Sequence, residues 1–247
     1  MKETIIEFKD VHKSFNGLFV HNGINLSIRK GEIISLLGGS GSGKSVLLKE
    51  LIGLLKPDNG EITVMGKNIV QMNEEALMEL REHVGMVFQG AALFDSLTVY
   101  ENVAYPLREH LKLTEREISE RVAEKLYLVG LIGIERKMPD ELSGGMKKRV
   151  GIARAIATDP SIILYDEPTT GLDPMTAQRI NELIIDLQKK LGVTTIVVTH
   201  DLQCVKTVSN RIAMLYNGKI ITVGTWDELL QSKIQVVKDF ISGNICI

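Results

Sequence analysis

The segment Gly38-Gly39-Ser40-Gly41-Ser42-Gly43-Lys44-Ser45 decides the fold expected of this chain. It matches the pattern G-x-x-x-x-G-K-[ST], follows an apolar run over residues 32–37, and leads into residues 46–51, which begin with Val46 and are typical of a helix. Strand, glycine loop and helix in this order are the context that a phosphate-binding loop requires. Glycines let backbone N–H groups close around phosphate oxygens, and the helix N-terminus adds positive potential. The sequence therefore predicts an α/β fold that binds a nucleoside triphosphate.

A second acidic segment follows later in the chain. Residues 161–167 form a buried-strand pattern that ends in Asp166 and Glu167. In such sites an aspartate holds Mg²⁺ while a neighbouring carboxylate polarises the attacking water, as the Ser45 hydroxyl ligates the ion and Lys44 reaches the β- and γ-phosphates. Asp-Glu pairs are also common at solvated strand ends without any catalytic role. The segment that follows, Pro168-Thr169-Thr170-Gly171-Leu172-Asp173-Pro174, argues against that interpretation here.

Together with Leu142-Ser143-Gly144-Gly145-Met146, these motifs resemble the ATP-binding cassette (ABC) ATPases over nearly the whole chain. The resemblance implies a single ABC domain over residues 1–247. Its RecA-like α/β core, with an antiparallel β layer, is expected to comprise residues 1–88 and 159–226. A helical subdomain is expected at 89–158 and a C-terminal helix at 227–247.

The same resemblance assigns site residues by their place in the motif order. Gln89 corresponds to the glutamine that contacts Mg²⁺ and senses the γ-phosphate, and His200 to the histidine that bonds the γ-phosphate. Phe15 corresponds to the aromatic residue that stacks on adenine. The implied catalytic residues are Glu167, His200, Gln89 and Lys44, and the implied metal ligands are Ser45, Gln89 and Asp166. The implied ATP-binding residues are Phe15, Gly38, Gly39, Ser40, Gly41, Ser42, Gly43, Lys44, Ser45, Val46, Gln89, Ser143, Gly144, Gly145, Asp166, Asp173 and His200.

The glycine pair after Leu142 carries a further implication of the family. In ABC ATPases this segment opens a helix that completes the nucleotide site of a second copy. Ser143, Gly144 and Gly145 are therefore expected to reach the γ-phosphate of ATP held by a partner chain, with Asp173 both capping a helix and contacting that partner. Met146 departs from the usual glutamine, and altered contacts near the ribose are expected there.

Composition excludes several other classes. Net charge is −2 with both signs mixed, and no basic stripe indicates nucleic acid. The two cysteines, Cys204 and Cys246, have neither metal spacing nor a disulfide framework, which favours a reducing cytosol. No signal peptide is expected at the N-terminus, and no apolar run approaches the ~20 residues that span a bilayer. Any membrane-spanning part is expected to belong to another subunit, with this chain peripheral at the cytoplasmic face of the inner membrane.

The segment from Phe88 to His110 resembles the ATPases of Mla-type lipid transporters. This resemblance implies an MlaE-like permease and an MlaD-like MCE-domain protein as partners, with the apolar stretch after Gln89 forming the groove for a permease helix. Two alternatives stay open: an ATPase of an amino-acid or other small-solute importer, and a non-membrane ABC ATPase of the iron–sulfur assembly type. A long C-terminal extension for dimer contacts is expected to be absent or abbreviated.

Local patterns predict the remaining elements. Short strands are expected near residues 5–8, 26–28 and 61–64, with turns at 16–17 and 58–60. Capping boxes begin helices after Thr114 and Thr225, and Asp173-Pro174 begins a long helix. Apolar residues at 236, 237, 240 and 241 are expected to dock the last helix. The other histidines (His12, His21, His83 and His110) are expected to have surface or packing roles.

Overall fold

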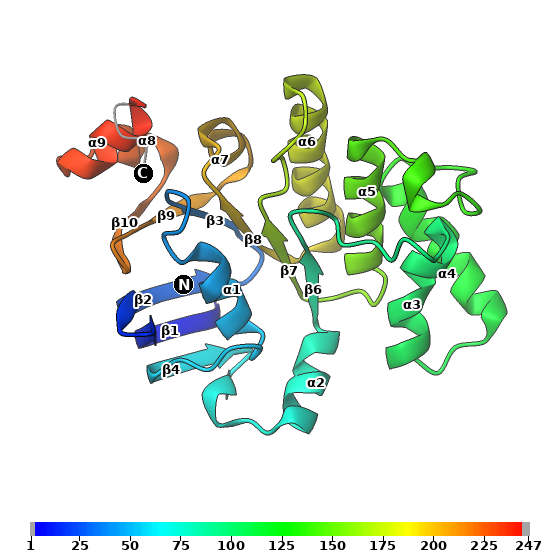
Figure 1. Cartoon of the computed structure of the whole chain (residues 1–247), viewed down its shortest axis with the longest axis horizontal. Coiled ribbons are helices and arrows are strands. Elements are labelled where there is room, and N and C mark those ends of the chain that lie inside the picture. Colours follow the sequence, from blue (N-terminus) through cyan, green and yellow to red (C-terminus); the bar gives the residue numbers. More distant parts are fainter. Residues whose placement is uncertain (1–2, 244–247) are drawn as a thin grey trace. The chain divides into compact units, whose positions relative to one another are not determined.

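The structure, a computed structural model, describes residues 3–243, so Cys246 and the end of the expected 227–247 helix lie outside the described residues (Figure 1). The chain divides into two compact units. The first comprises residues up to Leu80 together with those from Thr194 onward, and the second comprises residues from Arg81 to Val193. Both units contain strands and helices, and the α/β fold class is confirmed.

An antiparallel sheet makes one layer of the first unit. Its order is β2-β1-β4-β5, formed by β1 (Thr4–Phe15), β2 (Leu18–Arg29), β4 (Asn59–Val64) and β5 (Lys67–Asn68). The predicted strands were too short, because β1 and β2 form one long hairpin around Asn16 and Gly17. The turn predicted at residues 58–60 is wrong, since Asn59 and Gly60 already belong to β4. A Cβ on Gly60 would lie 2.3 Å from the Asp10 carbonyl oxygen, so the glycine there serves close strand packing.

The second layer of this unit contains the strand that precedes the phosphate loop. Within the unit its order is β10-β9-β3-β8, where β3 (Ile33–Leu37) pairs in parallel with β8 (Thr194–Thr199) and with β9 (Arg211–Tyr216), and β10 (Lys219–Gly224) is antiparallel to β9. Every residue of β3 and β8 is buried, as strands covered on both faces require. The helices of the unit that precede β9 are α1 (Lys44–Leu51), the 3₁₀ turn η1 (Ile69–Gln71), the first part of α2 (Glu74–Glu82), and α7 (Leu202–Val208).

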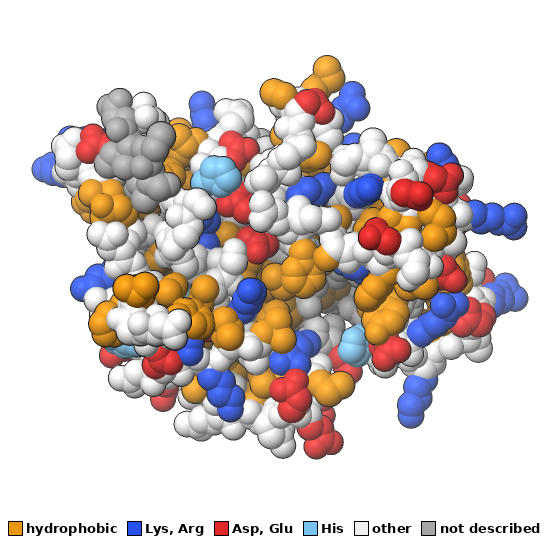
Figure 2. Space-filling view, viewed as in Figure 1, with side chains coloured by type: hydrophobic (Ala, Val, Ile, Leu, Met, Phe, Trp, Pro, Cys, Tyr) orange, Lys and Arg blue, Asp and Glu red, His pale blue; other side chains and the backbone are white. Residues whose placement is uncertain are grey.

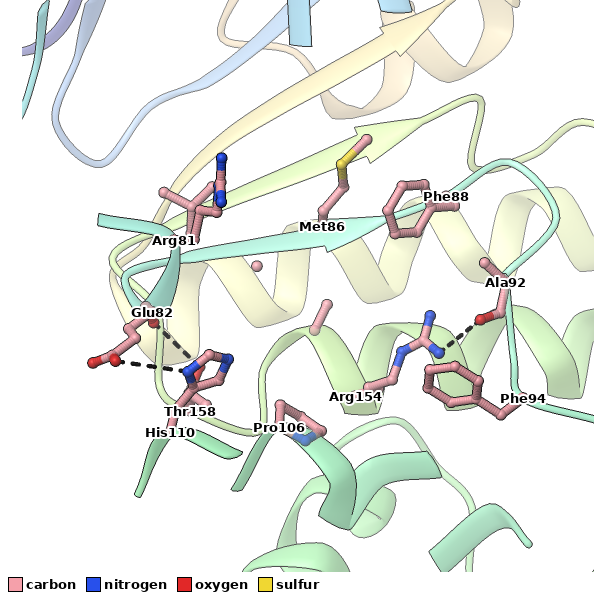
Figure 3. Close-up of a pocket in the computed structure, with 13 residues that line it drawn as sticks. Arg81, Glu82, Met86, Phe88, Ala92, Phe94, Pro106, His110, Arg154 and Thr158 are labelled. Atoms are coloured by element: carbon pink, nitrogen blue, oxygen red, sulfur yellow. Dashed lines mark hydrogen bonds and ion pairs between the residues drawn. The ribbon is translucent and has the colours of Figure 1, made fainter. Parts of the chain in front are cut away.

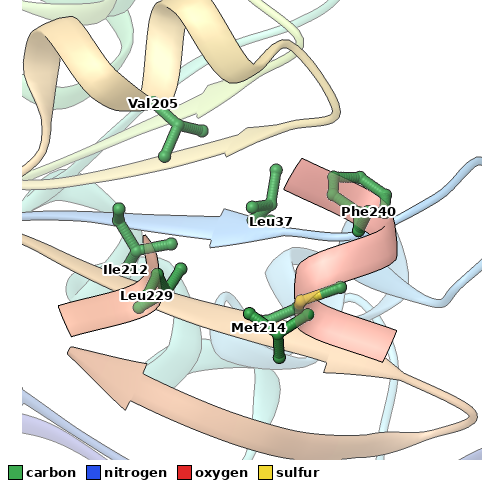
Figure 4. Packing of buried hydrophobic residues seen from close by; sticks show 7 residues of the cluster. Leu37, Val205, Ile212, Met214, Leu229 and Phe240 are labelled. Carbon is green, nitrogen blue, oxygen red and sulfur yellow. The ribbon is translucent and has the colours of Figure 1, made fainter. Parts of the chain in front are cut away.

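Two short helices, α8 (Trp226–Leu230) and α9 (Gln235–Ile241), follow β10 where one C-terminal helix was expected. Thr225 and Glu228 form the predicted capping box of α8. Val237 and Phe240 of α9 enter an apolar cluster with Leu37, Val205 and Met214, among others, and Val236 and Ile241 pack against it (Figure 4). The predicted docking of the last helix is therefore confirmed.

The second unit is mainly helical and includes the segment after Gln89. Its two strands, β6 (Val84–Val87) and β7 (Ile162–Asp166), pair in parallel. Its helices are α3 (Val99–His110), α4 (Glu115–Leu128), the 3₁₀ turn η2 (Pro139–Glu141), α5 (Gly144–Ala155) and α6 (Pro174–Leu191). The predicted starts of α4 and α6 are confirmed: Thr114 and Glu117 make a capping box, and Asp173 accepts hydrogen bonds from the backbone N–H groups of Met175 and Thr176.

Candidate functional site

The glycine segment forms a tight loop between β3 and α1, as the sequence predicts. Gly43 has φ +100° and precedes the helix, and its carbonyl oxygen accepts the first helical hydrogen bond from Leu47 N–H at 3.0 Å. A Cβ on Gly38 would lie 2.6 Å from the Leu215 carbonyl oxygen, so a side chain there would be excluded. The loop therefore ends at the N-terminus of α1, the positive end of a helix, which is where phosphate groups commonly bind.

Lys44 is buried and folds back over the loop. Its Nζ donates to the carbonyl oxygens of Gly38 at 2.8 Å and Gly39 at 2.7 Å. The ammonium therefore lies above the loop that precedes α1, where its charge adds to the positive end of the helix.

Two other predicted residues belong to the same unit. Phe15 ends β1 with 41% of its surface exposed, and Lys13 Nζ lies 5.4 Å from its ring centroid. His200 follows β8 directly and is exposed. Each therefore has a face available for contact with a bound molecule.

The acidic pair lies in the second unit, at the end of β7. Asp166 is the last strand residue, and the buried Glu167 has φ +49°, a left-handed conformation that is strained for a residue other than glycine. Thr170 Oγ donates to Glu167 Oε2 at 3.2 Å and Thr170 N–H donates to the Glu167 carbonyl at 3.3 Å. Residues held in this conformation cluster at functional sites, because surrounding contacts must maintain them.

A buried lysine that sequence reasoning missed joins this strand end to Gln89. Lys148 of α5 donates from Nζ to the backbone carbonyls of Gln89 and Glu167, the second at 3.2 Å. Burial lowers the pKa of Lys148, while the charges of Glu167 and Asp166 oppose that shift. The sequence does not indicate that Lys148 makes these contacts, because most lysines on helices are solvated.

The predicted partner-facing segment also lies in the second unit. Ser143 caps α5 by accepting a hydrogen bond from Met146 N–H at 3.3 Å, and both Ser143 and Gly144 are exposed. A Cβ on Gly145 would lie 2.6 Å from Thr176 Cγ2 of α6, so a glycine permits the close approach of the two helix starts. Asp173 caps α6, and its hydrogen bonds, first of all to Thr176, lower its pKa. The fold thus brings the Ser143 segment and the Asp173 segment together.

A groove of about 460 Å³ opens in the second unit beside β6 and α3 (Figure 3). Phe88 and Phe94 are 39% and 44% exposed, and the Phe94 ring centroid lies 5.1 Å from that of Tyr105. Arg154 donates to the carbonyls of Ala91 at 2.8 Å and Ala92 at 2.7 Å, which holds the segment after Gln89 along one wall. The groove therefore combines an apolar lining with a fixed guanidinium, and burial lowers the pKa of that guanidinium.

Residues 21–170, more than half of the chain, match the sequence profile of the ABC transporter family. The chain belongs to the ABC transporter family. The probable ribonucleotide transport ATP-binding protein mkl of Mycobacterium leprae is 45% identical over 96% of this chain and 69% of its own length. The intermembrane phospholipid transport ATP-binding protein MlaF of Haemophilus influenzae is 41% identical over 98% of this chain and 92% of its own length.

Further comparisons agree with this family. The methionine import ATP-binding protein MetN of Carboxydothermus hydrogenoformans is 42% identical over 89% of this chain and 65% of its own length. The ATP-binding cassette MJ0796, solved as a dimer in a post-hydrolysis state with ADP and Pi, matches with a TM-score of 0.83 and 34% identity, covering 89% of this chain and 98% of that one. As an ABC ATPase, the chain binds and hydrolyses ATP.

Within residues 3–243, every helix is too short or too polar to span a bilayer. The same residues contain no group of three or more His, Cys, Asp or Glu side chains that could hold a metal ion. Acidic and basic side chains are interspersed on the face in view in Figure 2, in keeping with the net charge of −2.

Proposed function

We propose that this chain is the ATP-hydrolysing subunit of a membrane transporter, that two copies close around two ATP molecules, and that their motion drives a separate permease carrying phospholipid. The observation that supports the cargo is the similarity to the phospholipid transport ATPase MlaF over nearly the full length of both chains. In this proposal an MlaE-like permease and an MlaD-like MCE-domain protein are the partners, and the chain is peripheral at the cytoplasmic face of the inner membrane.

Within each ATP site we assign the residues as follows. The 38–45 loop holds the phosphates, Lys44 neutralises charge on the β- and γ-phosphates, and Phe15 stacks on adenine. Glu167 orients and deprotonates the attacking water, and His200 bonds the γ-phosphate. The Ser143–Gly145 segment and Asp173 contact ATP held by the partner copy.

Mg²⁺ fits the donors that these segments supply. Ser45, Gln89 and Asp166 offer hydroxyl, amide and carboxylate oxygens, the hard ligands that Mg²⁺ prefers. Mg²⁺ is usually held by one or two carboxylates together with substrate phosphates and water, so a cluster of three acidic residues is not required. When bound, the ion would neutralise charge on the phosphate oxygens.

The groove beside β6 and α3 is the proposed dock for a permease helix. Exposed Phe88 and Phe94 supply the apolar contact area that aromatic residues contribute at interfaces, and Arg154 supplies a fixed positive charge. An amphipathic helix with an acidic residue near its apolar face has the matching chemistry.

An amino-acid importer is the second candidate, favoured by the 42% identity with MetN. The two are separated by reconstitution of the chain with an MlaE-like permease and an MlaD-like protein in phospholipid vesicles, and in parallel with a MetN-type permease. We expect the lipid transporter partners alone to stimulate ATP hydrolysis and to transfer labelled phospholipid. Stimulation by the amino-acid permease alone would overturn the proposed cargo.

The groove is tested in the same vesicles. Phe94→Ser is expected to reduce permease-stimulated hydrolysis while it leaves the unstimulated rate intact. Tyr127→Ser is the matched control, because Tyr127 is an exposed aromatic residue (69%) on α4 and does not line the groove. Equal loss in both variants would contradict the assignment of this surface.

A further inference from the structure

A buried histidine and a buried glutamate form a pair directly behind the phosphate loop. His21 of β2 and Glu50 of α1 are 0% and 1% exposed. His21 Nδ1 lies 2.8 Å from Glu50 Oε2, and His21 Nε2 lies 3.0 Å from the carbonyl oxygen of Gly43. The imidazole therefore links the Glu50 side chain on α1 to the backbone carbonyl of Gly43, the last loop residue before Lys44.

The contact with Gly43 fixes the donor role of one ring nitrogen. A carbonyl oxygen only accepts hydrogen bonds, so Nε2 carries a proton and donates to the Gly43 carbonyl. His21 Nδ1 and Glu50 Oε2 lie at ion-pair distance without the alignment of a hydrogen bond. The proximity of an imidazole to a carboxylate offsets part of the cost of burying both groups.

Packing of the core does not require polar residues at these two positions. The other inward-facing residues of β2 include Ile24, Leu26 and Ile28, and the buried residues of α1 include Leu47, Leu48 and Leu51. An apolar residue would suit either pattern, and replacing a buried ionic pair with apolar residues is often neutral or stabilising. Both carboxylate oxygens of Glu50 and Nδ1 of His21 are buried without a hydrogen-bond partner in the described structure, which adds to the cost of the pair.

We propose that His21 is a positioning residue for ATP binding, oriented by Glu50, and that it sets the direction of the peptide between Gly43 and Lys44. In a trans peptide the C=O and N–H point in opposite directions. The hydrogen bond from His21 is a second one to the Gly43 carbonyl, beside that from Leu47 N–H. Together they hold the carbonyl toward the interior and so direct the Lys44 N–H away from it, to where the loop receives phosphate. The anchor matters because Gly43 has φ +100° and glycine resists few backbone rotations.

The inference rests on the proposed phosphate-binding role of residues 38–45. Its test is the double variant His21→Leu/Glu50→Leu, which removes both polar groups without leaving a lone buried charge. We expect the variant to fold with an unchanged or higher melting temperature. Its KM for ATP should rise about two- to tenfold, as the loss of one hydrogen bond implies, with a smaller change in kcat. A folded double variant with the wild-type KM would overturn the inference.

Glu50→Gln is the conservative rescue. Its amide can donate to Nδ1 while Nε2–H still donates to Gly43, so the KM of this variant should lie within about twofold of wild type. His12→Leu is the matched control, because His12 lies 3.0 Å from Asp10 in a more exposed pair on β1. A rise in KM in His12→Leu as large as in the double variant would contradict a specific role for His21.

Two further measurements keep the outcomes separate. Lys44→Ala is measured in parallel. If this variant retains ATP affinity, the phosphate-loop assignment fails. If it loses ATP affinity while the double variant keeps the wild-type KM, only the role of His21 is refuted. If the double variant does not fold, ¹⁵N NMR of the wild-type chain decides. A His21 Nε2 proton protected from exchange supports the inference, and its absence overturns it.

Discussion

Lys148→Met removes a buried ammonium and preserves most of the side-chain volume. The Nζ atom holds the carbonyls of Gln89 and Glu167, and Glu167 needs such restraint because its φ is +49°. A hydrogen bond to a charged group contributes about 1.5–3 kcal/mol. The loss of two such bonds is offset in part, because the variant no longer buries a charge. Burial of that charge is what lowers the pKa of Lys148. We therefore expect a net loss of about 2 kcal/mol in unfolding free energy.

Calorimetry and the rate of ATP hydrolysis measure the effect of this substitution. In a chain of this size 1 kcal/mol lowers the melting temperature by about 2–4 °C, so calorimetry should show a fall of about 4–8 °C. Release of Glu167 should displace the carboxylate that we propose activates water, and a misplacement of about 1 Å can cost on the order of 10²-fold in rate. We expect kcat to fall at least about tenfold while ATP affinity changes little, because Lys148 Nζ donates to carbonyls at Gln89 and Glu167, which lie outside the 38–45 loop.

Lys147→Met is the control for this experiment, since Lys147 directly precedes Lys148 on α5 and is only partly buried. It should keep the wild-type melting temperature and kcat. A Lys148→Met variant that also matches wild type in both measurements would refute the reasoning that this side chain supports the strand end.

Three other perturbations have defined outcomes. Glu167→Gln should lower ATP hydrolysis about 10²–10⁴-fold yet retain ATP binding in a filter or fluorescence assay, and near-normal turnover would sink the assignment of the base. Hydrogen bonds from Lys13 and then Ser14 lower the pKa of Asp58 to about 2 from 3.8. Stability from this carboxylate is therefore present above pH 3.8 and lost as pH falls through about 2, so urea unfolding of Asp58→Asn should lack that part of the acid dependence. Asn102 is fully buried, and its amide makes four hydrogen bonds to the segment from Phe94 to Thr98. Asn102→Ala should therefore lower the melting temperature and loosen the groove. Unchanged hydrogen exchange of residues 94–98 would argue against this.

Several segments of the candidate site were predictable because their signals are local. The glycine loop lies between an apolar strand and a helix within a few residues, and the Asp173-Pro174 pair specifies a helix start through contacts three residues apart. Strand lengths were less predictable: the register of β1 with β2 depends on partners up to 25 positions away, such as Thr4 opposite Arg29. Such cross-strand pairing leaves little trace in either segment alone.

The amino-acid sequence by itself determined the phosphate loop, the acidic strand end, the Ser143 segment and the order in which they occur, because each depends on neighbouring residues and on backbone conformations that glycine, proline and capping side chains prescribe. Only the tertiary structure decided that His21 and Lys148 support those segments from inside the fold. His21 meets Gly43 across 22 positions and Lys148 meets Gln89 across 59. A buried polar group acquires its role from the partner that compensates its desolvation, and that partner is chosen by folding in three dimensions.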